Sequence, residues 1–145
     1  MGQLFYPDLI DVLRQQGMTA VLAQTGGDGV DGWPGGVRGG AGRQVAEDYV
    51  QDMQALIGDP ARTYDEVGVV GFSLHGSIVP VALTPEFLAS LPATTKLIGV
   101  MALSNTFLPN WIRQRGYEDY EMDLRPEVIA SLGQVDPYPA IARLH

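Results

Sequence analysis

Apolar residues recur at helical spacing over several stretches of the chain. The first such stretch begins beside Pro7 and ends before Gly17, and these residue types are typical of a helix start and a helix stop. A second amphipathic pattern covers residues 45–57, where acidic residues fill the face opposite the apolar one. Residues 77–83 are ambiguous, and we favour a helix kinked at Pro80 over a strand. Shorter helices are predicted over residues 85–91, 108–115 and 125–132.

Three short runs are apolar almost throughout, as is typical of strands covered on both faces. They are residues 18–23, 67–72 and 96–103, and a turn over residues 58–62 precedes the second run. Helices and buried strands therefore alternate along the chain. This alternation predicts an α/β fold with a mainly parallel sheet, flanking helices and right-handed crossovers.

The length of 145 residues suits one domain, which would bury roughly two-thirds of its unfolded surface. Within this single domain of residues 1–145, we expect residues 1–104 to form the sheet core. Residues 105–145 are richer in aromatic and charged side chains and should form a cap-like helical segment. Residues 26–42 contain nine glycines and are expected to form a long loop.

The composition excludes several classes of function. Nine basic against seventeen acidic residues give a net charge of −8, so nucleic acid is not an expected partner. Cysteine is absent, which excludes thiolate nucleophiles and cysteine zinc sites but leaves the redox compartment open. No apolar run approaches the length of a membrane span, and the first residues lack a basic and then apolar leader pattern. We therefore expect a soluble, cytoplasmic protein.

Residues 27–32 match the pattern G-x-G-x-x-G, which binds dinucleotides where it opens a helix. Here the pair Trp33-Pro34 follows, and Asp28 and Asp31 would repel phosphate. The same two aspartates also miss the spacing of a calcium loop. We therefore predict no cofactor and no metal site.

The most informative segment is Gly-Phe-Ser-Leu-His-Gly over residues 71–76, at the end of a predicted buried strand. A serine in such a turn is held at the carboxyl end of the sheet, where the hydroxyl of Ser73 can meet a substrate carbonyl. The amide of Leu74 would then point at the developing oxyanion. A serine at this type of junction also serves as a simple helix cap, and the flanking elements favour the nucleophile.

This segment, with the helix and strands around it, resembles the nucleophile elbow G-x-S-x-G of the α/β-hydrolase superfamily. The resemblance extends over roughly residues 4–145 and implies a truncated internal portion of that fold. His75 stands where the family has its second glycine, with Gly76 one residue later. The family's catalytic acid and its late histidine have no clear counterparts here, so only Ser73 and the Leu74 amide carry over by position.

The imidazoles of the chain are His75 and His145, and both are candidate catalytic residues. For His75 a structural or pocket-lining role is favoured over that of general base. His145 is the last residue, and a base supplied by another chain is an alternative. The function predicted is hydrolysis of small-molecule carboxylic esters through Ser73. The alternative is a non-catalytic remnant, or one half of a split hydrolase. Either reading leaves sheet edges unpaired, so we expect a homo-oligomer or a partner chain.

Overall fold

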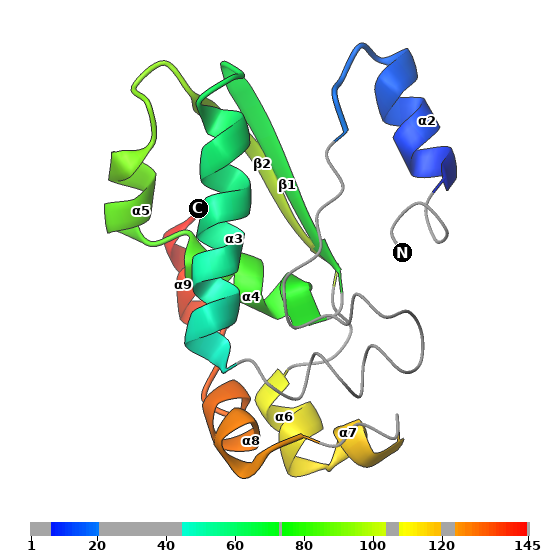
Figure 1. The fold of residues 1–145 in the computed structure, drawn as a ribbon, viewed down its shortest axis with the longest axis vertical. Helices are drawn as coiled ribbons and strands as arrows, with labels where there is room; N and C mark the ends of the chain where they lie inside the picture. The colour runs from blue at the N-terminus through cyan, green and yellow to red at the C-terminus, as the bar shows by residue number, and fades with distance from the viewer. Residues whose placement is uncertain (1–6, 21–44, 73, 104–107, 120–123, 145) are drawn as a thin grey trace.

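The structure is a computed structural model that describes residues 7–20, 45–72, 74–103, 108–119 and 124–144. Figure 1 shows a long helix, α3 (Ala46–Ala61), running alongside a two-stranded sheet. Shorter helices surround this unit, and the described part of the chain is therefore a mixed α/β structure.

The two strands of the described residues, β1 (Glu66–Phe72) and β2 (Lys96–Leu103), pair in parallel. The register places Glu66 opposite Lys96 at the start of the sheet. A parallel pair requires a crossover connection, and helices lie between these strands in the chain. The predicted strands over residues 67–72 and 96–103 and their parallel pairing are confirmed.

One face of the sheet is covered by α3 and by α4 (Leu74–Ala82), which follows β1 in the crossover. The side chains at the centre of this core are almost completely buried: Tyr49, Met53, Ile57, Ile78 and Val79. Those on α3 recur every fourth residue, which places them on one side of the helix. Each such side chain contributes about 1.5–3 kcal/mol on burial. The apolar stripe of α3 therefore anchors the sheet to the rest of the molecule.

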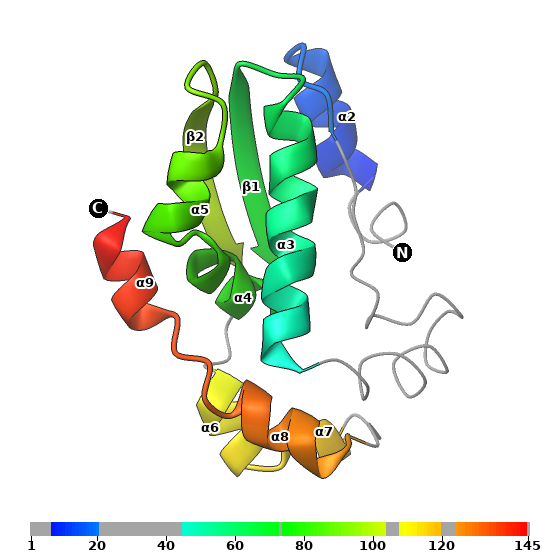
Figure 2. The same cartoon turned by 60° about the vertical axis from the view of Figure 1, so that its left-hand side comes forward.

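The other face of the sheet is more open. In Figure 1 the helix α2 (Pro7–Gln15) lies to the right of the strands, away from α3. In Figure 2 it lies behind the upper part of α3. Its Ile10 is buried, but Val12 is exposed. Val70 of β1 and Ile98 of β2 are 45% and 50% exposed. Within the described ranges, apolar surface on this side therefore remains in contact with solvent, whereas parallel sheets are normally covered on both faces.

Three of the C-terminal helices lie at one end of the sheet: α6 (Leu108–Arg113), α7 (Gly116–Asp119) and α8 (Pro126–Leu132). The last helix, α9 (Tyr138–Arg143), returns to contact α4, and α5 (Pro85–Ser90) lies in the crossover between β1 and β2. Figures 1 and 2 show α6, α7 and α8 beyond the end to which the arrowheads of β1 and β2 point. The C-terminal segment joins the same core through Ile112, Leu124, Val128, Leu132 and Val135. The helices expected over residues 108–115 and 125–132 are confirmed, whereas α7 and α9 were not predicted.

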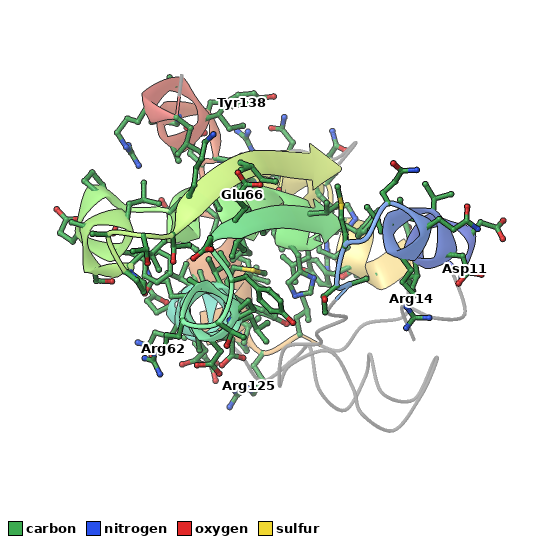
Figure 3. All side chains as sticks on the ribbon, turned by 90° about the horizontal axis from the view of Figure 1, so that it is seen from above. Asp11, Arg14, Arg62, Glu66, Arg125 and Tyr138 are labelled. Atoms are coloured by element: carbon green, nitrogen blue, oxygen red, sulfur yellow. The ribbon has the colours of Figure 1, made fainter. Side chains whose placement is uncertain are left out.

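Charged side chains lie mainly on the surface. Figure 3 shows Asp11, Arg14, Arg62 and Arg125 pointing outwards from their helices. The ion pair between Arg14 and Asp11 is 3.9 Å long and exposed. Exposed pairs of this kind contribute about 0–1 kcal/mol each. The apolar core therefore determines the fold of the described residues.

The structure corrects two of the predicted elements. The expected strand over residues 18–23 has no regular structure at residues 18–20, and residues 21–23 lie outside the described part of the chain. Gly17 has a φ of 76°, and the N–H of Met18 donates to the carbonyl of Leu13 at 3.0 Å. These two features are typical of a helix C-cap. Met18 therefore belongs to the C-terminal cap of α2 and does not begin a strand.

The predicted turn over residues 58–62 is also wrong, because α3 continues to Ala61. Ile57 and Ala61 are both buried, so the apolar stripe extends through this segment. Pro60 lies in the last turn, where the missing N–H removes one hydrogen bond of the helix. The helix predicted over residues 77–83 is confirmed as part of α4, which begins at Leu74 and contains Pro80.

Candidate active site

The candidate site lies where β1 passes into α4. The strand ends at Phe72 and the helix begins at Leu74, so a single residue separates the two elements. That residue is the predicted nucleophile Ser73, whose own placement lies outside the described residues. The strand–residue–helix order expected for an elbow is therefore present in the flanking residues.

Gly71 explains how α4 folds back onto the strand so abruptly. A Cβ atom at this position would lie 2.5 Å from the carbonyl oxygen of His75 and 2.8 Å from Cγ2 of Val79. Both distances are shorter than real Cβ contacts, so no residue with a side chain fits without a shift of α4. The small residue two positions before Ser73 is thus a steric requirement of the junction.

Leu74, the candidate oxyanion donor, is the first residue of α4, and its side chain is half-buried against the core. The first four N–H groups of a helix have no carbonyl partner within that helix. They point back toward the preceding strand end, and the helix dipole favours negative charge there. The start of α4 therefore presents backbone donors of the type that stabilises an oxyanion.

His75 is the second residue of α4 and is half-buried. Its ring meets the ring of Tyr49 on α3 edge to face, with centroids 5.9 Å apart and planes at 73°. Tyr49 is fully buried. The structure thus directs the imidazole toward α3. The amphipathic pattern of residues 45–57 predicts an apolar face, but it does not predict this contact with another helix.

His145 and the glycine-rich segment over residues 26–42 lie outside the described residues. Among the residues that are described, no three His, Asp or Glu side chains gather as a metal site would require. In the same part of the chain no helix has both the length and the apolar character of a membrane span.

No protein-family model, curated protein or solved structure matches this chain. The resemblance to α/β hydrolases therefore rests on residues 71–76 and on the elements that flank them. A functional assignment has to be argued from the junction itself.

One titratable group with a shifted pKa lies away from this junction, between α6 and α7. The pKa of Arg115 is raised by its hydrogen bond to the carboxylate of Glu118 and by the charge of that carboxylate. Arg115 also has a φ of 57°. This pair lies in the turn between two short helices, and both side chains are exposed, so we assign it no catalytic part.

Proposed function

We propose that the chain is a serine hydrolase that cleaves small carboxylic esters, with Ser73 as the nucleophile. The observation that carries the proposal is the close approach of α4 to β1 at Gly71, on either side of a single intervening serine. A truncated α/β-hydrolase fold is the architecture that we propose for the whole chain. The cytoplasm is the compartment that we propose, and a cysteine-free chain is compatible with it.

In the proposed reaction the Oγ atom of Ser73 attacks the carbonyl carbon of the ester, and its proton passes to a base. The carbonyl oxygen becomes an oxyanion, which accepts a hydrogen bond from the N–H of Leu74. Collapse of the tetrahedral intermediate breaks the ester bond and releases the alcohol, which takes the proton from the base. Water then hydrolyses the acyl-enzyme, releasing the acid and restoring the hydroxyl. We propose His145, from the same or another copy of the chain, as the base.

The second candidate function is that of a partner module in a larger hydrolase assembly. The observation that favours it is the open side of the sheet, where Val70 and Ile98 are about half exposed. Both edges of the two-stranded sheet also lack a further strand within the described residues. Exposed apolar faces and free strand edges favour association. We therefore propose that the chain acts as a homo-oligomer or with a partner chain.

Turnover of p-nitrophenyl acetate by the purified full chain tests the first proposal. We expect Ser73→Ala to abolish turnover, because the acyl-enzyme cannot form without the hydroxyl. Ser90→Ala is a matched control, since Ser90 is an exposed serine of α5 and should leave turnover unchanged. Equal turnover by Ser73→Ala and the original chain would contradict the enzymatic function and favour the partner module.

A further inference from the structure

Three elements meet at His75. Its backbone carbonyl packs directly over Gly71 at the end of β1. Its ring contacts Tyr49 of α3, and its backbone forms part of the first turn of α4. The position of this one residue therefore determines how the start of α4 lies relative to both the strand and α3.

Tyr49 provides a fixed surface for that contact. Its ring is fully buried, and hydrogen bonds hold α3 on either side of it. Near its start, the N–H of Ala46 donates to Oγ of Ser131 at 2.7 Å. Further along, Nε2 of Gln54 donates to the carbonyl oxygen of Ala82, at the end of α4, at 2.9 Å. The helix that carries Tyr49 is thus tied to both α8 and α4.

We propose that Tyr49 is a positioning residue for the oxyanion donor. By holding the ring of His75, it keeps the first turn of α4, and with it the N–H of Leu74, in the orientation that the transition state needs. This inference rests on the proposed ester hydrolysis. It also assigns His75 a role that depends on its ring and not on proton transfer.

Two physical arguments favour a packing role for the His75 ring over a role of His75 as general base. The observed contact is edge to face, and this geometry is shared by all aromatic rings. A general base must also become protonated, and the positive charge would then lie in the first turn of α4. The helix dipole disfavours a cation at that end. We therefore assign His75 the part of holding the turn in place and not that of accepting the proton of Ser73.

The consequence is specific to the transition state. Loosening the turn should weaken the hydrogen bond to the oxyanion without changing how the ester binds, so kcat should fall and KM should stay constant. We expect a fall in kcat of roughly two- to tenfold, the factor that an edge-to-face aromatic pair is worth.

Four variants test this inference through the rate at which a fluorophosphonate labels Ser73 and through kcat and KM for p-nitrophenyl acetate. Tyr49→Leu and His75→Gly remove a ring, and both should show the fall in kcat and a similar fall in labelling rate. Tyr49→Phe and His75→Phe keep a ring in each place and should retain both rates within about twofold. Circular dichroism establishes that each variant is folded at the assay temperature.

Met53→Leu is the matched control, because Met53 lies one turn further along the same buried stripe of α3. It should lower the melting temperature slightly and leave kcat unchanged, which separates positioning from general stability. If Tyr49→Leu does not fold, His75→Gly decides the question alone, because His75 is only half-buried.

The outcomes separate this inference from the proposed function. If the original chain fails to label at Ser73, both are wrong. If it labels and the folded Tyr49→Leu and His75→Gly variants label equally fast, only the positioning role is wrong. A loss of more than a hundredfold in folded His75→Phe would also overturn the inference, because it would make the imidazole itself the base.

Discussion

Replacing Gly71 with alanine should destabilise the junction between β1 and α4. The added Cβ would lie 2.5 Å from the carbonyl oxygen of His75 and 2.8 Å from its carbonyl carbon. These atoms belong to the helix backbone and cannot rotate away, so α4 must shift as a unit. Overpacking costs about 1–3 kcal/mol, and we expect about 3 kcal/mol here because the obstacle is backbone.

Urea unfolding followed by circular dichroism measures this loss. With a typical slope of about 1–3 kcal/mol per molar urea, a loss of about 3 kcal/mol lowers the midpoint by about 1–3 M. Gly68→Ala is the control in the same strand, since a Cβ there would come no closer than 4.0 Å to Cγ1 of Ile98. Gly68→Ala should be neutral or stabilise the fold by up to about 1 kcal/mol. A Gly71→Ala midpoint equal to that of the original chain would refute the steric argument.

Three further outcomes follow from other contacts. Ser131→Ala removes the acceptor for the N–H of Ala46 and the donor to the carboxylate of Glu47. The unfolding free energy should therefore fall by about 1 kcal/mol in the urea assay. An unchanged unfolding free energy would contradict the bridge from α8 to α3. Thr84→Ala removes the N-cap bond from Phe87 N–H and should cost about 1 kcal/mol, whereas Thr84→Ser should restore it. Sedimentation at micromolar concentration should give a mass above the 15.6 kDa of one chain, and a folded monomer would contradict the proposed association through the open sheet.

The sheet and its covering helices could be predicted because their causes are local. The runs at residues 67–72 and 96–103 are apolar, and they pair as parallel strands. The spacing of apolar residues in α3 predicts the face that packs on the sheet. The predicted end of α3 is too early, because Pro60 favours a turn in the sequence. In the structure the helix continues through Pro60, since the burial of Ala61 offsets the loss of one N–H donor.

The contacts that build the candidate site could not be predicted in the same way. The sequence indicates that Gly71, Ser73 and Leu74 form a tight junction, and the close approach at Gly71 agrees with that interpretation. The edge-to-face contact of Tyr49 with His75 joins two helices that are separate in the chain. Periodicity identifies Tyr49 as buried, but it carries no information on which residue of another element the ring will meet.

Mapping the adduct of a fluorophosphonate on the purified full chain tests the central claim most directly. Peptide mass spectrometry locates the modified residue, and denatured chain serves as the control for unspecific reaction. The nucleophile assignment predicts a single adduct on the peptide that contains Ser73, formed only by folded chain and lost in Ser73→Ala. An adduct on a different serine, or equal labelling of folded and denatured chain, would contradict it.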